Sequence, residues 1–150
     1  MNYSFDNFFK MKKIFLLVSL SVFIFGCSKD KFNNNNPYLP NYSFSIDINK
    51  TFPPYDQLNY SGQGVKANAA NGPLRGVIIF NTGSGYTAFD GSCPNQNITS
   101  CSALTIVGGN AKCSCDNASY SLFTGQCPGK EYPLKQYRVE VNGEILRVYN

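Results

Sequence analysis

The sequence between residues 86 and 125 reads YTAFDGSCPNQNITSCSALTIVGGNAKCSCDNASYSLFTG. It opens on strand-forming residues, 86–90, and a second strand-like run covers 104–107, where Gly108-Gly109 supplies a turn. One cysteine-containing loop follows 86–90. A second, with Cys113 and Cys115, follows the turn at Gly108-Gly109. The pattern predicts short strands that present two cysteine-containing loops.

Both flanks of this stretch predict more strands. The apolar run 76–81 and the turn 82–85 make a hairpin with 86–90. Residues 137–141 alternate, Asn142-Gly143 is a strong hairpin turn, and 144–149 return. Residues 42–48 also alternate apolar and polar side chains. Since no helical pattern of convincing length and no repeat occurs, we expect an all-β domain over 42–150, a small antiparallel β-sandwich or barrel.

The N-terminus predicts a lipoprotein signal. From Met11, which we take as the true start, two lysines precede an apolar run of 12 residues, 14–25. This run is too short to span a bilayer and fits a signal-peptide core. It ends in Ile-Phe-Gly before Cys27, which resembles a lipobox. We therefore expect residues 1–26 to be removed, Cys27 to be lipidated, and the chain to lie on the cell envelope, at the outer membrane.

Residues 27–41 predict a tether between the lipid and the domain. They are rich in Asn and Pro and have little apolar surface to bury. Loss of residues 1–26 removes three lysines and one aspartate, so the net charge falls from +4 to +2. This weak, scattered charge does not predict a nucleic-acid partner.

The composition excludes several classes of enzyme. The chain has no histidine, which rules out Ser-His-Asp hydrolysis, Cys-His proteolysis and any zinc site that uses histidine. Asp90, Asp116 and Glu131 are scattered acids without EF-hand spacing, and we interpret them as surface residues rather than a calcium or catalytic site. With Cys27 lipidated, five cysteines remain in an oxidising compartment, and five is odd.

A family resemblance rests on four segments, 86–95, 111–125, Pro133-Leu134 and 137–141. Together they resemble a Rieske [2Fe–2S] domain, in motifs and in the order of hairpin, first cluster loop, second cluster loop, Pro loop and closing hairpin. The resemblance runs from about Gly76 to the end of the chain. It implies a Rieske-like fold with the two cluster loops at a tip.

The resemblance also identifies the ligand positions. A Rieske cluster takes two cysteines on one iron and two histidines on the other. The cysteine positions correspond to Cys93 and Cys113, which are present, but Asn95 and Asp116 stand at the histidine positions. A carboxamide is a poor iron ligand and a carboxylate is a hard one.

The remaining cysteines leave several readings open. Cys115 stands where some Rieske proteins have a disulfide between the two loops, with Cys101 as its partner, and Cys93 and Cys113 would then form a second bond. Alternatively, Cys93, Cys101, Cys113 and Cys115 would supply four thiolates to a [2Fe–2S] cluster. Thiol redox work by Cys113 and Cys115 lacks the helix N-terminus typical of such motifs. We expect Cys127 to be the odd thiol.

These observations predict a non-enzymatic envelope lipoprotein. Its Rieske-like domain would hold no metal or cofactor and would have a structural or interaction role with an envelope protein. The alternative is a Rieske-type electron carrier with a [2Fe–2S] cluster on non-standard ligands.

Overall fold

The computed structural model describes residues 34–150, and these form a nearly all-β unit. The elements are β1 (Ser45–Asn49), the 3-10 helix η2 (Tyr55–Asn59), β2 (Gly64–Ala67), β3 (Val77–Asn81), β4 (Tyr86–Asp90), β5 (Leu104–Val107), β6 (Asn110–Cys113), β7 (Ser119–Ser121), β8 (Gln136–Asn142) and β9 (Ile145–Tyr149). The predicted signal segment 1–26, Cys27 and the tether up to residue 33 lie outside the described residues. Within residues 34–150, no helix is long and apolar enough to cross a bilayer.

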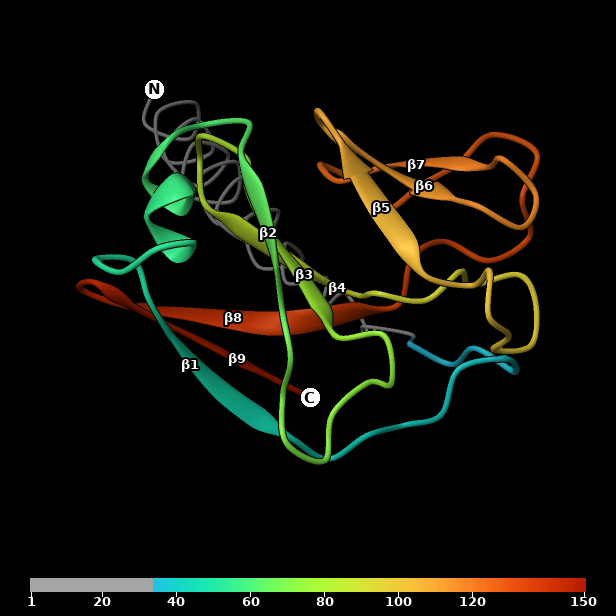
Figure 1. Cartoon of the computed structure of the whole chain (residues 1–150), viewed down its shortest axis with the longest axis horizontal. Coiled ribbons are helices and arrows are strands. Elements are labelled where there is room, and N and C mark those ends of the chain that lie inside the picture. The colour runs from blue at the N-terminus through green and yellow to red at the C-terminus, as the bar shows by residue number, and fades with distance from the viewer. Residues whose placement is uncertain (1–33) are drawn as a thin grey trace, which may run out of the picture. The chain divides into compact units, whose positions relative to one another are not determined.

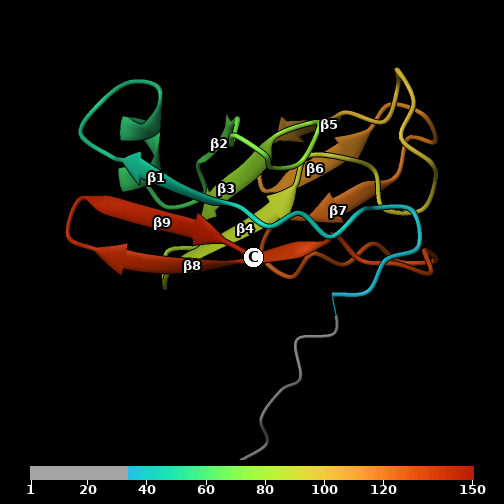
Figure 2. The ribbon, with the colours of Figure 1, turned by 90° about the horizontal axis from the view of Figure 1, so that it is seen from below.

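The strands form two antiparallel sheets. The larger has six strands in the order β1-β9-β8-β4-β3-β2, and the smaller has three in the order β5-β6-β7. Figures 1 and 2 show the small sheet over one end of the large one, where the connecting loops gather. The predicted hairpin of 76–81 with 86–90 is confirmed, with Asn81 opposite Tyr86 in β3-β4. The turn predicted at Gly108-Gly109 joins β5 to β6, with Val107 opposite Asn110. The expected all-β, Rieske-like fold is therefore present.

Residues 42–75 add the two edges of the large sheet. β1 pairs with β9, and β2 pairs with β3, so each forms an edge strand. The Pro53-Pro54 segment leads into η2, whose Leu58 is completely buried against the sheet. This region thus completes the sheet rather than wrapping around it.

The core has two compartments separated by β3. Val77 and Ile79 of this strand face one cluster with β1, β2, β9 and η2, whereas Ile78 and Phe80 face the other, under the small sheet. All four side chains are fully buried. A strand that is covered on both faces is expected to be a continuous apolar run, which is what Val-Ile-Ile-Phe provides.

Two local predictions need correction. The first strand covers 45–49 rather than 42–48. In the last hairpin, Asn142 pairs with Ile145, so the turn residues are Gly143 and Glu144 rather than Asn142 and Gly143. Gly143 has a φ of +60°, which a glycine adopts without strain as the first residue of such a turn.

The predicted tether also ends earlier than expected. Residues 34–41, which we call the strap, lie on the domain instead of extending from it. The Asn34 side chain bonds both the N–H and the C=O of Gln136, and Leu39 is 3% exposed. An asparagine amide has both a donor and an acceptor, so it can pair with a backbone N–H and C=O as a neighbouring strand would. A prediction of disorder from composition does not account for such pairing.

Candidate functional site

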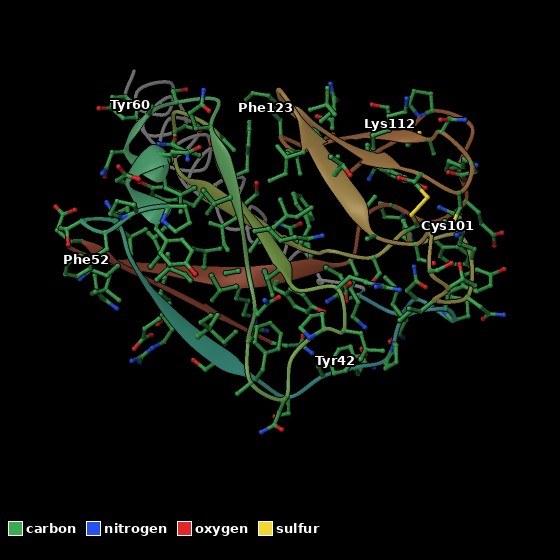
Figure 3. The ribbon with its side chains drawn as sticks, in the orientation of Figure 1. Tyr42, Phe52, Tyr60, Cys101, Lys112 and Phe123 are labelled. Carbon is green, nitrogen blue, oxygen red and sulfur yellow. A yellow bond between two sulfur atoms is a disulfide. The ribbon has the colours of Figure 1, made fainter. Side chains whose placement is uncertain are left out.

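Three loops meet at one end of the domain and form what we call the tip. They are residues 91–103 between β4 and β5, residues 114–118 between β6 and β7, and residues 126–134 before β8. Figure 3 places Cys101 at this end and Phe52 and Tyr60 at the other. Among residues 34–150, the positions that the sequence singled out, including both cysteine loops, lie in the tip or at its base.

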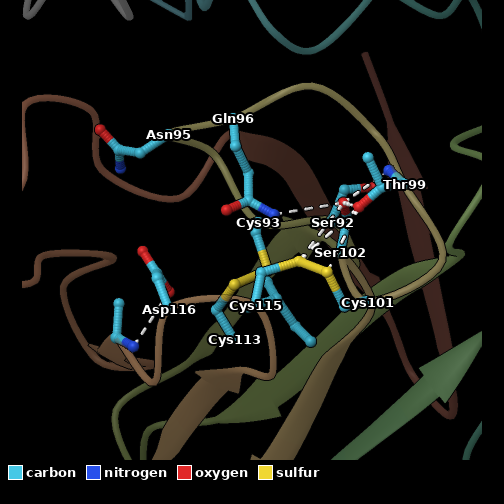
Figure 4. The surroundings of a disulfide bond; sticks show 12 residues. Ser92, Cys93, Asn95, Gln96, Thr99, Cys101, Ser102, Cys113, Cys115 and Asp116 are labelled. Carbon is cyan, nitrogen blue, oxygen red and sulfur yellow. Dashed lines mark hydrogen bonds between the residues drawn. A yellow bond between two sulfur atoms is a disulfide. The ribbon is translucent and has the colours of Figure 1, made fainter.

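A buried disulfide joins the first two loops. Cys93 and Cys113 are bonded with a Cα–Cα distance of 5.6 Å, within the usual range, and both are at most 1% exposed. Backbone bonds hold both ends, from Cys93 N–H to Ser102 C=O and from Cys113 N–H to Ala118 C=O, each 2.8 Å. The two cysteine positions that the family resemblance singled out are therefore linked to each other (Figure 4).

A second disulfide lies beside the first, nearer the surface. It joins Cys101 to Cys115 with a Cα–Cα distance of 5.1 Å. The Thr99 hydroxyl lies 3.3 Å from the Cys101 sulfur and 3.7 Å from that of Cys115. The Cys101–Cys115 bond agrees with the pairing that the family resemblance implies, and the Cys93–Cys113 bond agrees with the second pairing considered from the sequence. Each closes a loop of a size for which about 3 kcal/mol of stabilisation is typical.

Asn95 connects the first loop to the third. Its amide N–H₂ donates to the Tyr132 carbonyl at 2.7 Å and to the Tyr120 hydroxyl at 2.9 Å. Its amide oxygen accepts from the Tyr132 N–H at 2.9 Å. Both ends of the carboxamide are thus used within the tip, and the residue acts as a clamp between two loops.

Asp116 connects the second loop to the third. Its carboxylate accepts from Ala118 N–H at 3.0 Å and pairs with the Lys130 ammonium at 2.5 Å. Desolvation of the carboxyl raises its pKa, but the hydrogen bond and charge of Lys130 outweigh this effect, and the pKa of Asp116 lies below its ordinary value. The same bond raises the pKa of Lys130.

A buried polar network supports the base of the tip. Asp90, 1% exposed, accepts from Ser92 N–H at 2.8 Å and from the Tyr137 hydroxyl at 2.9 Å. Burial raises the pKa of Asp90 and also that of Tyr137. Asp90 and Asp116 are therefore engaged separately, and the expectation that Asp90 is a surface residue is wrong, because its carboxyl group is buried in this network.

The strap is fastened to this end of the domain by Lys135. Its ammonium, in a side chain that is 2% exposed, donates to Leu39 C=O at 3.2 Å, Pro40 C=O at 2.9 Å and Asn41 Oδ1 at 2.6 Å. Burial lowers the pKa of Lys135. Lys130, Tyr132 and Lys135 could not be predicted as part of the site, because none of them belongs to a motif.

Cys127 is the one cysteine in the described part of the chain without a disulfide. It is half-buried in the third loop, and its sulfur lies 3.8 Å from the Pro128 carbonyl oxygen. This agrees with the expectation that Cys127 is the odd thiol.

With both disulfides formed, the residues of the tip do not fit a [2Fe–2S] cluster. Such a cluster needs four sulfur or imidazole ligands. In the structure, Cys93 and Cys113 are consumed by their own bond, as are Cys101 and Cys115, and Asn95 and Asp116 are engaged in hydrogen bonds. Among residues 34–150, no group of three or more metal-ligating His, Cys, Asp or Glu side chains is found.

Comparisons with known proteins support the fold. The chain is similar to a solved chain from a complex of reduced oxygenase and oxidised ferredoxin in carbazole 1,9a-dioxygenase, with a TM-score of 0.50 and 17% identity over 71% of this chain and 94% of that one. A ferredoxin from Sphingomonas yanoikuyae B1 is also similar, with a TM-score of 0.46 and 17% identity over 63% of this chain and 93% of that one. No family model matches the chain, and the search of curated proteins finds no match. The likeness shows a Rieske-like fold and nothing finer.

Proposed function

We propose that the chain is a non-enzymatic lipoprotein of the bacterial envelope, anchored through a lipid on Cys27. In this proposal, its Rieske-like domain has lost the [2Fe–2S] cluster and its tip is a structural or interaction surface for another envelope protein. The single observation that supports it most is the disulfide between Cys93 and Cys113, the two positions that would otherwise bind iron.

The disulfides would replace the structural role of a cluster. A cluster cross-links two loops through its ligands, and the Cys93–Cys113 bond cross-links the same loops directly. Asn95 and Asp116 then extend the cross-linking to the third loop through Tyr132 and Lys130. A surface that is held rigid before binding loses less conformational entropy when a partner docks, and this favours an interaction role.

The alternative, an electron carrier with non-standard ligands, is favoured by the likeness to a chain from an oxygenase–ferredoxin complex. It requires both disulfides to open, because four thiolates are then available to iron. The two functions therefore differ in the oxidation state of the same four sulfur atoms, which form two disulfides in one and four thiolates in the other.

The experiment that tests the proposal is cluster reconstitution. The full chain is reduced, supplied anaerobically with iron and sulfide, and examined by visible absorption and iron content. A matched control is the double variant Asn95→His with Asp116→His, which restores the Rieske ligand set. We expect the native chain to stay colourless, and stoichiometric iron with cluster absorption in the native chain would refute the proposal.

A further inference from the structure

The strap is joined to the tip by several contacts. The Asn36 amide donates to the carbonyl of Pro94, in the first loop, at 2.8 Å. The ring of Tyr38 packs edge-on against that of Tyr132, in the third loop, with centroids 5.9 Å apart. The strap therefore contacts two of the three tip loops in addition to Lys135.

The first described residue of the strap also lies at this end. Asn34 makes two hydrogen bonds to the backbone of Gln136, the residue that opens β8 directly after the third loop. In Figures 1 and 2 the cyan strap begins near the start of β8 and runs out toward the tip loops before turning back, and the turn between β8 and β9 lies at the opposite end of the domain. The chain thus enters the domain at the base of the tip.

Chain length then limits how far the tip can be from a lipid. Seven residue steps separate Cys27 from Asn34. A fully extended chain of that length spans about 25 Å at most. A flexible tether over all of residues 27–41 would reach farther than this. The reach is shorter because the strap is fixed to the domain from residue 34 onward.

We propose that the tip is the membrane-facing end of the domain, so that a protein recognised by the tip lies at the same membrane. This inference rests on the proposed function, since the limit starts from a lipid on Cys27. A protein surface suits the tip better than the bilayer itself. The charged side chains of the second and third loops, Asp116, Lys130 and Glu131, have both signs, whereas lipid-binding surfaces are basic or strongly apolar.

The test is energy transfer from the tip to the bilayer. The full lipidated chain is labelled with a donor dye on Cys127, the half-buried thiol of the third loop, and is bound to vesicles that contain an acceptor dye on the lipid headgroups. A second sample has the donor at the far turn, in the variant Glu144→Cys with Cys127→Ser. We expect higher transfer efficiency from the tip than from the far turn.

One strap variant and a matched control separate orientation by the strap from simple tethering. Asn34→Ala with Asn36→Ala removes three hydrogen bonds between strap and domain, and the difference between the two donors is expected to shrink. The matched control Asn59→Ala removes a side-chain bond to Lys50 C=O far from the strap and is expected to keep the difference. An unchanged difference in the strap variant would contradict the role of the strap.

Failure of the proposed function and failure of the proposed orientation give different results. Mass spectrometry of the chain from the membrane fraction reads the lipid on Cys27 before any dye is attached. A chain without this lipid would refute the proposed function and, with it, the orientation. A lipidated chain that gives equal transfer from both donors, or more from the far turn, would refute the orientation alone.

Discussion

Asn95 and Asp116, for which the family resemblance implies histidine positions, both connect to the third loop. The carboxamide of Asn95 donates and accepts at once, and Tyr132 presents both an N–H and a C=O to it. An imidazole has one ring nitrogen on each side and cannot match this pair of backbone groups as a planar amide does. The choice of residue at position 95 therefore fits a clamp.

Replacement of Asn95 tests this clamp. Asn95→Ala leaves the polar groups of Tyr132 and the Tyr120 hydroxyl without their partner, and Tyr120 is fully buried. We expect the free energy of unfolding in urea to fall by about 1–3 kcal/mol. The control Asn97→Ala, at an exposed site of the same loop, should stay within about 0.5 kcal/mol of the native chain. Equal effects of the two variants would contradict the clamp.

The ion pair at Asp116 predicts a dependence of stability on pH. Because the pKa of Asp116 is lower in the folded chain than its ordinary value of 3.8, its contribution is complete above that value and is lost as the pH falls through the lowered pKa. Urea denaturation at a series of acidic pH values measures this loss. Asp116→Asn should make stability less dependent on pH in this window, and a curve identical to that of the native chain would contradict the pair.

At the scale of elements, the apolar runs predicted the central hairpins well. β3 is buried on both faces and β4 follows a polar four-residue turn, so local sequence determines both. The turn of the last hairpin is displaced by one residue because Gly143, not Asn142, takes the first turn position. Such a shift depends on which cross-strand register packs best, which a local turn motif does not specify.

The strap could not be predicted, and the reason is physical. Its order comes from bonds between residues about a hundred positions apart, such as Asn34 with Gln136 and Lys135 with Pro40. Local composition contains no information about these partners. The site was predicted only in part. The resemblance located Cys93, Cys113, Asn95 and Asp116, but Tyr132 and Lys130 lie in the third loop outside its Pro133-Leu134 motif.

Gly91 tests the start of the first tip loop. A Cβ at this position would collide with the carbonyl oxygen of Arg75, which belongs to the backbone and cannot move aside easily. We expect Gly91→Ala to destabilise the domain by about 1–3 kcal/mol or more, as overpacking does. Gly85→Ala is the control, because a Cβ there meets no atom within 4 Å. Thermal denaturation of both variants checks this, and a Gly91→Ala chain as stable as the control would contradict the packing.

At the scale of the whole molecule, the two sheets bring three loops together and the disulfides fix them. The buried bond joins the base of the first loop to the end of β6. A reducible cross-link of this kind restricts the unfolded chain as well as the folded one. Stability of the whole domain is therefore expected to depend on oxidation.

Removal of the buried disulfide measures that dependence. The double variant Cys93→Ala with Cys113→Ala should lose about 2–5 kcal/mol of unfolding free energy in urea under oxidising conditions. The native chain and the variant should differ little once both are fully reduced. A variant as stable as the oxidised native chain would mean that the Cys93–Cys113 bond does not stabilise the domain.

The most direct measurement is a map of the cysteines in the chain taken from cell membranes, with free thiols blocked at the moment of lysis. The proposed function predicts a blocking group on Cys127 alone among the five cysteines after Cys27, and peptides that link Cys93 to Cys113 and Cys101 to Cys115. Blocking groups on Cys93 and Cys113, together with one cluster's worth of iron for each chain, would contradict it.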